Sequence, residues 1–284
     1  MSINNNINYN NWLKYASNKL LLAGINNSKL EAEILLSKVT NNKRNKLILL
    51  KDKKLTYKQY NKLLQLIFRR INREPLAYIL GYHEFWSLKI YVSYNTMIPR
   101  ADTECLVEYI LNLSSNKKML VLDLGTGSGI ISLALAKEKP KWIITSVDYY
   151  IKTLSIAKYN AIKLKLYNIK FILSNWFSNI RFYNYNIIVS NPPYLKISDW
   201  YNVQPELYFE PKTAFLAGYD GLMYLKLICY QSKNFLAYNG WLILEHDYQQ
   251  GNFVRNTLKE IGFKNVGTGY DYNNYERFSF GQLL

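Results

Sequence analysis

A glycine-rich turn between an apolar run and a helical pattern constrains the fold of this chain more than any other feature. Residues 121–131 have the sequence Val-Leu-Asp-Leu-Gly-Thr-Gly-Ser-Gly-Ile-Ile. Glycine adopts backbone angles that are closed to other residues and lets a ligand approach the main chain, and the first turn of a helix carries unpaired N–H groups. The segment therefore predicts a strand, a tight loop that holds a ligand, and a helix.

Strand-like apolar runs and helical stretches alternate along the chain after residue 118. We expect strands at residues 119–124, 142–147, 169–173, 187–189 and 241–244, with strand-like ends at 263–266 and 277–281. We expect helices at residues 130–137, 151–165, 222–235 and 252–261. Alternation of this kind specifies a parallel sheet that is covered by helices on both faces. The chain is therefore predicted to have an α/β fold.

The first part of the chain has a different pattern. Apolar residues recur at intervals of three and four, as in amphipathic helices, over residues 12–20, 32–39 and 63–71. Ser28 lies three residues before Glu31, and Thr56 lies three before Gln59, so both pairs have the spacing of a capping box. We expect a small helical domain over residues 1–74.

Residues 75–100 form a third region, in which aromatic and β-branched residues alternate with other residues. A period of two is typical of β-strands, so we expect a β-hairpin linker there. The α/β domain then covers residues 101–284.

The chain of 284 residues is basic, with 36 Lys and Arg, 20 Asp and Glu and a formal net charge of +16. Clustered cations bind nucleic acids by releasing phosphate counterions. Here, however, lysine is spread along the chain and accompanies abundant Asn, Ile and Tyr, whose codons are rich in A and T. We therefore attribute the charge mainly to base composition and solvated faces. Nucleic-acid binding is not expected to be essential.

Cysteine and histidine are too few for a disulfide framework or a zinc site, because the chain has only Cys105, Cys229, His83 and His246. We expect no metal and a reducing, cytoplasmic environment. No apolar run approaches the roughly 18 residues of a membrane span, and the polar N-terminal stretch is unlike a signal peptide. A soluble protein without membrane attachment is expected.

Two acidic residues flank the glycine-rich turn. Asp123 directly precedes it, and Asp148 ends the next expected strand. The spacing Gly125-x-Gly127-x-Gly129 differs from the dinucleotide fingerprint, and a carboxylate beside it suits a cationic ligand better than a pyrophosphate. This favours S-adenosylmethionine, with Asp148 accepting hydrogen bonds from the ribose hydroxyls. The alternative is a tight turn that binds no ligand.

The third expected strand is followed by Asn175, Trp176 and Phe177. The amide of Asn175 could bind the exocyclic amine of an adenine whose ring lies on Trp176. The alternative is that Trp176 and Phe177 pack in the core, as aromatic residues at strand ends usually do. The position after the third strand favours the cofactor interpretation.

The fourth strand ends in the sequence Asn191-Pro192-Pro193-Tyr194. Two prolines cannot continue a strand ladder, and they make the turn rigid. The Asn191 side-chain oxygen and the Pro192 carbonyl could accept both hydrogens of a planar amine or amide, and Tyr194 could pack on the group that carries it. Methyl transfer depends largely on alignment of the nucleophile. The turn therefore predicts methylation of a planar nitrogen on a nucleobase or a glutamine.

Glu245 and His246 follow the expected strand at residues 241–244. We interpret them as the polar end of that strand rather than as acid–base groups. An amide nitrogen needs no strong base at the outset, since its proton leaves after the nitrogen has become cationic.

Several segments together resemble one protein family. They are residues 73–81, 84–86, 98–104 (Ile-Pro-Arg-Ala-Asp-Thr-Glu), 123–129, 191–194, 209–211 (Phe-Glu-Pro), 244–246 (Leu-Glu-His) and 274–277. They are similar to the peptide-chain release factor glutamine methyltransferases, the PrmC (HemK) family. The resemblance extends from about residue 70 to the C-terminus and departs from the family pattern at Ala101, Asn175 and Asp247.

The resemblance implies a five-helix-like N-terminal domain for substrate recognition, a hairpin and a seven-stranded class I methyltransferase domain. The implied enzyme is a cytoplasmic monomer that transfers a methyl group from S-adenosylmethionine to the glutamine of the Gly-Gly-Gln motif in class I release factors. With the residues argued above, the expected cofactor contacts are Asp123, Gly125, Thr126, Gly127, Ser128, Gly129, Asp148, Asn175, Trp176 and Asn191. The expected substrate contacts are Asn191, Pro192, Pro193 and Tyr194, of which Asn191, Pro192 and Tyr194 act in catalysis.

Three alternatives stay open. A glutamine methyltransferase of ribosomal proteins is closely related, although residues 98–104 resemble the release-factor branch. A DNA or RNA amino-methyltransferase shares the Asn-Pro-Pro-Tyr turn and would suit the positive charge. A binding protein without turnover would keep the same fold, but the presence of Asp123, Asp148 and Asn191 argues against it.

Overall fold

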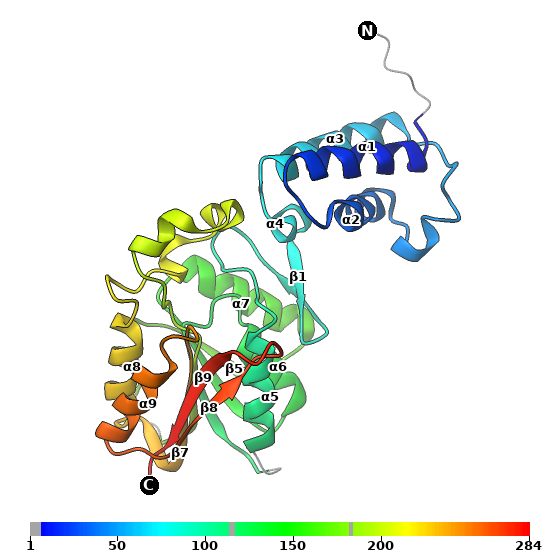
Figure 1. The fold of residues 1–284 in the computed structure, drawn as a ribbon. Helices are drawn as coiled ribbons and strands as arrows, with labels where there is room; N and C mark the ends of the chain where they lie inside the picture. The colour runs from blue at the N-terminus through cyan, green and yellow to red at the C-terminus, as the bar shows by residue number, and fades with distance from the viewer. Residues whose placement is uncertain (1–6, 114–116, 182–183) are drawn as a thin grey trace. The chain divides into compact units, whose positions relative to one another are not determined.

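The computed structural model describes residues 7–113, 117–181 and 184–284. Contacts divide the chain into two compact units, shown as ribbons in Figure 1. The helical unit comprises the chain up to Gly81 together with Pro205–Phe209, and the sheet unit comprises Tyr82–Gln204 and Glu210–Leu284.

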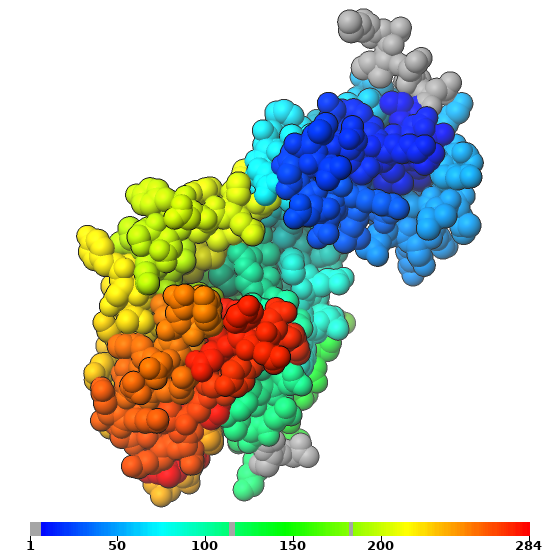
Figure 2. All heavy atoms as spheres, in the orientation of Figure 1, coloured from blue at the N-terminus to red at the C-terminus, as the bar shows by residue number. Residues whose placement is uncertain are grey.

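The helical unit contains four α-helices and two short 3₁₀ helices among its described residues. They are α1 (Tyr9–Leu22), α2 (Ser28–Thr40), a 3₁₀ helix (Arg44–Lys46), α3 (Tyr57–Ile71), α4 (Leu76–Leu80) and a 3₁₀ helix (Pro205–Phe209). The expected apolar stripes face one another in a core that includes Trp12, Leu35 and Leu63. Figure 2 shows one outer face of this unit, mostly in blue.

One of the two expected capping boxes is present. The Thr56 side chain accepts from the Gln59 backbone N–H at 3.2 Å, and the Gln59 side chain accepts from the Thr56 N–H at 3.0 Å. The expectation at Ser28 is wrong, because Ser28 is already the first helical residue and Asn27 caps α2 without a side-chain hydrogen bond.

The segment Pro205–Phe209 is an unexpected part of the helical unit. Glu206 accepts hydrogen bonds from Arg70 at 3.1 Å and from Arg73 at 2.8 Å. Arg70 is buried and also binds Glu31, so two carboxylates compensate its charge. The sequence did not predict that this segment joins the helical unit, because Glu206 lies 133 residues after Arg73.

The expected hairpin is present but shorter than residues 75–100. Its strands are β1 (Tyr82–Phe85) and β2 (Leu88–Tyr91), which pair antiparallel, whereas residues 76–80 form α4 in the helical unit. Asn160 fixes the hairpin within the sheet unit, since its side chain accepts from the Tyr91 N–H at 2.9 Å and donates to the Tyr91 carbonyl at 3.0 Å.

The sheet unit contains the seven-stranded sheet that the resemblance implies. Its order is β5 (Ile169–Leu173), β4 (Ile143–Asp148), β3 (Leu120–Leu124), β6 (Tyr185–Ser190), β7 (Leu236–Glu245), β9 (Glu276–Gln282) and β8 (Lys264–Tyr270). The strands β5, β4, β3, β6 and β7 are parallel, and β9 runs antiparallel to both of its neighbours. The α/β expectation is confirmed, with one antiparallel insertion at the edge.

Helices cover both faces of this sheet (Figure 1). They are α5 (Thr103–Leu113), α6 (Ile130–Glu138), α7 (Ile151–Leu164), α8 (Met223–Ser232) and α9 (Gly251–Glu260). The helices α5, α6 and α7 contact in sequence, as do α8 and α9. The sequence analysis missed α5, whose buried residues include Leu106 and Ile110. This helix brings Thr103 to the edge of the sheet where the strands end, as described below.

Candidate active site

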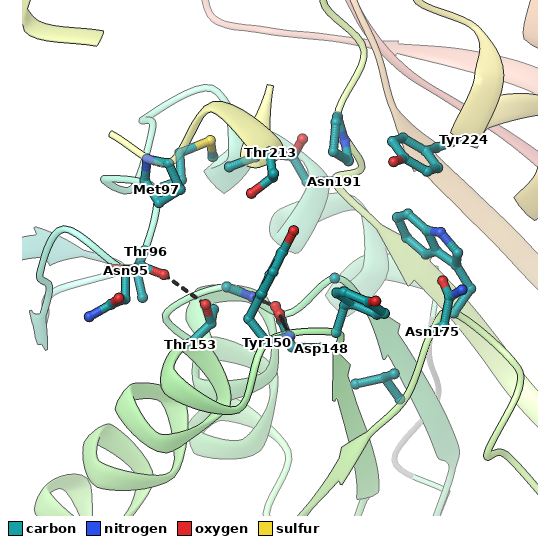
Figure 3. Close-up of a pocket in the computed structure, with 18 of the residues that line it drawn as sticks. Asn95, Thr96, Met97, Asp148, Tyr150, Thr153, Asn175, Asn191, Thr213 and Tyr224 are labelled. Carbon is teal, nitrogen blue, oxygen red and sulfur yellow. Dashed lines mark hydrogen bonds between the residues drawn. The ribbon is translucent and has the colours of Figure 1, made fainter. Parts of the chain in front are cut away.

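A pocket with a volume of about 640 Å³ lies at the carboxyl ends of the central strands. Gly125 and Gly127 follow β3, Asp148 ends β4, Trp176 follows β5 and Asn191 follows β6. Figure 3 shows Asp148, Asn175 and Asn191 around this pocket. Open α/β sheets bind ligands at this edge because the loops after parallel strands meet there.

The glycine-rich loop has the backbone that its sequence predicts. Gly125, Gly127 and Gly129 have φ angles of 69°, 59° and 92°, in the left-handed region that favours glycine. A Cβ atom on Gly127 would meet no heavy atom within 4 Å, whereas one on Gly129 would lie 3.2 Å from the Ala157 Cβ. Gly127 therefore faces open pocket, and Gly129 permits close packing of α7.

Asp123 lies beneath the loop and does not line the pocket. Its carboxylate is fully buried and accepts hydrogen bonds from the hydroxyls of Thr126 and Ser132, each at 2.6 Å. Burial raises the pKa of Asp123 to about 6. Thr126, Ser128 and Gly129 are likewise absent from the pocket lining. In the structure these four expected cofactor residues build the loop instead of facing the pocket.

The charge on Asp123 predicts a pH-dependent stability effect. An aspartate in the unfolded chain ionises near pH 4, so between about pH 4 and pH 6 the folded chain retains a proton that the unfolded chain has released, and stability falls. We expect Asp123→Asn to raise the free energy of unfolding above pH 6 by about 1–2 kcal/mol, with a smaller gain towards pH 4. Urea unfolding of the cofactor-free protein across this range measures it, and a gain independent of pH would contradict it.

Asp148 connects the glycine loop to the rim of the pocket. Its Oδ2 accepts from the Gly127 N–H and its Oδ1 from the Tyr150 N–H, both at 3.0 Å. Burial raises the pKa of Asp148, against the opposing effect of the backbone N–H donors. Each oxygen has one main-chain partner and keeps further acceptor capacity on the pocket side.

The aromatic residues after β5 separate into two roles. Trp176 lines the pocket, with its ring 3.6 Å from the position of a Cβ on Gly125 and its centroid 5.0 Å from that of Tyr224. Phe177 is buried and stacks on Phe235 at 4.5 Å. Trp176 therefore faces the pocket, as the cofactor interpretation expects, whereas Phe177 packs in the core, as the alternative expects. Asn175 lines the pocket as well.

The Asn191–Tyr194 turn places two of its four residues in the pocket lining, Asn191 and Pro193. Pro192 is buried. The Tyr194 ring packs against the sheet core, and its carbonyl accepts from the Gln250 side chain at 2.9 Å. Burial is also the main reason that the pKa of Tyr194 is raised. The structure thus brings Asn191 together with Asp148 and the glycine loop. Tyr194 does not line the pocket, in contrast to the expectation that its ring packs on the acceptor group, because the ring packs against the sheet core.

Sequence reasoning missed several residues of the pocket wall. They include Tyr149, Tyr150, Tyr224, Thr153 and the segments 95–97 and 211–214. Tyr149 and Tyr150 directly follow Asp148, so their position was a usable signal. Tyr224 carries no such signal.

Glu210 holds two of these wall segments together. Its carboxylate accepts from the Ile98 N–H at 2.8 Å and from Arg100 at 2.6 Å. This contact joins the Ile-Pro-Arg and Phe-Glu-Pro segments, which are distant in sequence and both carry the family resemblance.

The pocket fits S-adenosylmethionine. The open space beside Gly127, the carboxylate of Asp148 and the aromatic wall of Trp176 and Tyr224 would accommodate a nucleoside with a cationic tail. The volume lies within the range of about 300–1,000 Å³ usual for small-molecule sites, and Asn191 is part of the lining.

Two further properties concern the described residues alone. Within residues 7–113, 117–181 and 184–284, no helix is long and apolar enough to cross a membrane. In the same ranges no group of three or more His, Cys, Asp or Glu is arranged to hold a metal ion, and Cys105 and Cys229 are both buried thiols.

Sheet order, glycine loop and pocket define a class I S-adenosylmethionine-dependent methyltransferase. Residues 101–210 match the methyltransferase small domain and residues 11–81 the PrmC N-terminal domain. The chain belongs to the release factor glutamine methyltransferase family, as its similarity to curated relatives shows.

Two relatives and one solved structure illustrate this similarity. The release factor glutamine methyltransferase of Buchnera aphidicola subsp. Schizaphis graminum is 44% identical, over 98% of this chain and 99% of that protein. The protein of the same name from Escherichia coli is 40% identical, over 96% and 98%. The hMettl16 catalytic domain in complex with MAT2A 3′UTR hairpin 6 shares the fold, with a TM-score of 0.59, 15% identity and coverage of 82% and 85%.

Proposed function

We propose that this enzyme methylates the side-chain amide nitrogen of the glutamine in the Gly-Gly-Gln motif of class I peptide-chain release factors. One observation carries the proposal: Asn191 of the Asn-Pro-Pro-Tyr turn faces the same pocket as Asp148 and the glycine loop, in a chain similar over nearly its whole length to release factor glutamine methyltransferases. The enzyme acts as a cytoplasmic monomer, and the helical unit recognises the release factor.

The cofactor is held by the loop edge and the aromatic wall. Asp148 would accept hydrogen bonds from the ribose hydroxyls, Gly125 and Gly127 would allow close approach to the main chain, and Asn175 with Trp176 would bind the adenine, since all five residues line the pocket. Bound S-adenosylmethionine supplies an electrophilic methyl group on a sulfonium centre. Asp123, Thr126, Ser128 and Gly129 maintain the loop that these contacts require.

The turn aligns the glutamine amide. The Asn191 Oδ1 and the Pro192 carbonyl accept the two amide hydrogens, while Pro193 and Tyr194 keep the turn in place. Fixing both hydrogens orients the nitrogen towards the methyl group, and such positioning supplies much of the acceleration. The amide nitrogen loses its proton after the new C–N bond has formed, so no strong base is needed beforehand.

The decisive experiment incubates the enzyme with labelled S-adenosylmethionine and a release factor, and compares native Gly-Gly-Gln with a glutamine-substituted control. We expect label in the native factor alone. Equal label in both factors would refute the glutamine assignment. Label in added ribosomal protein, DNA or RNA but not in the release factor would favour the other acceptors, and cofactor binding without any transfer would indicate a binding protein.

A further inference from the structure

Glu245 is a buried carboxyl group that the proposed reaction does not yet use. It is the last residue of β7, directly after Leu244, which pairs with Ser190 at the end of β6. Glu245 and Asn191 therefore leave neighbouring parallel strands at the same edge. Glu245 is 1% exposed, and its Oε2 has no hydrogen-bond partner among the described residues. A buried carboxylate is costly, which makes a purely structural strand end a poor explanation.

Thr103 connects Glu245 to the pocket. The Asn191 Nδ2 donates to the Thr103 Oγ1 at 3.2 Å, and the side chains of Thr103 and Asn191 both lie close enough to the Glu245 carboxyl to lower its pKa. Thr103 is fully buried at the start of α5. No described residue donates to the Asn191 Oδ1.

The donors and acceptors of Glu245, Thr103 and Asn191 fix the direction of hydrogen bonding among these three side chains. An ionised carboxylate only accepts, so the Thr103 hydroxyl donates its hydrogen to Glu245. The Thr103 oxygen then offers lone pairs to Asn191, which must present its NH₂ group. The Oδ1 of Asn191 is left facing the pocket as an acceptor.

We infer that Glu245 is a positioning residue for methyl transfer, which acts through Thr103 to hold the Asn191 amide with its oxygen towards the acceptor nitrogen. The inference rests on the proposed function, because a free acceptor at Asn191 is what an amide substrate requires.

The charges around Glu245 determine when this orientation holds. Arg277 on β9 and the carboxylate of Asp102 before α5 act on it in opposite senses, and Tyr194 lies near it on the turn. Burial raises the pKa of Glu245 to about 7, against the opposing hydrogen bond from Thr103. Protonated Glu245 can donate a hydrogen bond to Thr103, whose hydroxyl can then donate to Asn191. The Asn191 side-chain amide can then flip, so that its NH₂ group faces the pocket. Turnover should therefore rise with pH through about 7.

The test uses two substitutions, at Glu245 and Thr103, and two control variants. We expect Glu245→Gln and Thr103→Val each to lower kcat about 10- to 100-fold with S-adenosylmethionine affinity within about threefold, because a misaligned acceptor affects chemistry rather than cofactor binding. The double variant should lose little more than either single one. Thr103→Ser should retain most activity, and Asp247→Asn, which removes a charge two positions after Glu245, should resemble the wild type.

The pH dependence separates positioning from a general loss of structure. The wild type and Asp247→Asn should show a rising limb in kcat near pH 7, and Glu245→Gln should lack it. The NMR signals of the Asn191 side-chain amide, assigned by their loss in Asn191→Ala, should shift with the same midpoint in the wild type and not in Glu245→Gln. This second readout needs no methyl acceptor.

Each contrary result has a distinct meaning. Wild-type kcat in Glu245→Gln or in Thr103→Val, an unchanged rising limb in Glu245→Gln, or Asn191 signals that ignore pH would overturn the inference and leave the proposed function standing. Absence of glutamine labelling by the wild type would refute the proposed function, and the NMR titration would still decide whether Glu245 orients Asn191.

Discussion

Asn191→Ala should lower kcat by about 100-fold or more while the affinity for S-adenosylmethionine stays within about tenfold. Asn191 lines the pocket, and its Nδ2 is engaged by Thr103, so its oxygen is the group available to hold an acceptor. Alanine removes that acceptor but leaves Asp148, Trp176 and the glycine loop in place. Single-turnover rates and calorimetric cofactor binding measure the two quantities separately.

The matched control for this prediction is Asn234→Ala, which makes the same change at an exposed residue after α8. It should behave as the wild type. If Asn191→Ala instead weakened cofactor binding alone and kept its turnover at saturation, Asn191 would be a cofactor ligand and the alignment mechanism would be wrong.

Asp148→Asn should weaken S-adenosylmethionine binding by about 100-fold, with kcat at saturating cofactor within about tenfold of the wild type. Both carboxylate oxygens accept a main-chain N–H in the structure. An amide has one acceptor oxygen, so its NH₂ group would face one of these N–H donors and loosen the loop. Hydrogen bonds to a charged group contribute about 1.5–3 kcal/mol each, and a loss of about 3 kcal/mol corresponds to about 100-fold in affinity.

Titration calorimetry measures this effect, with Glu260→Gln as the control because it removes one negative charge from an exposed residue at the end of α9. Unchanged affinity in Asp148→Asn would mean that the ribose is bound elsewhere. A loss of kcat without a loss of affinity would instead place Asp148 in the chemical step.

Much of the sheet unit could be predicted because its signals are local. Short apolar runs, a glycine-rich turn and helical periodicity each depend on neighbours in sequence, and all five strands expected between residues 119 and 244 are present. The helix α5 was missed because its first two residues, Thr103 and Glu104, end the segment Ile-Pro-Arg-Ala-Asp-Thr-Glu, which was interpreted as a motif and not as the start of a periodic pattern.

The candidate site could be predicted only at the strand ends. Asp148 and Asn191 each terminate or follow a strand, and parallel strands necessarily bring such residues together. Asp123 has the same kind of position, yet it turns inward to Thr126 and Ser132. Successive residues of a strand point to opposite faces, but which buried polar partner satisfies a carboxylate depends on the packed helix that supplies it.

The sequence by itself determined the α/β class, the glycine loop, the rigid proline turn and the acidic strand end, because each follows from backbone preferences and periodicity over a few residues. Only the tertiary structure decided that Thr103, 88 residues before Asn191, binds its amide, that Glu245 lies behind both, and that Glu206 joins the helical unit. Such contacts depend on how distant elements pack, since a buried polar group takes whichever partner the fold brings within hydrogen-bonding distance.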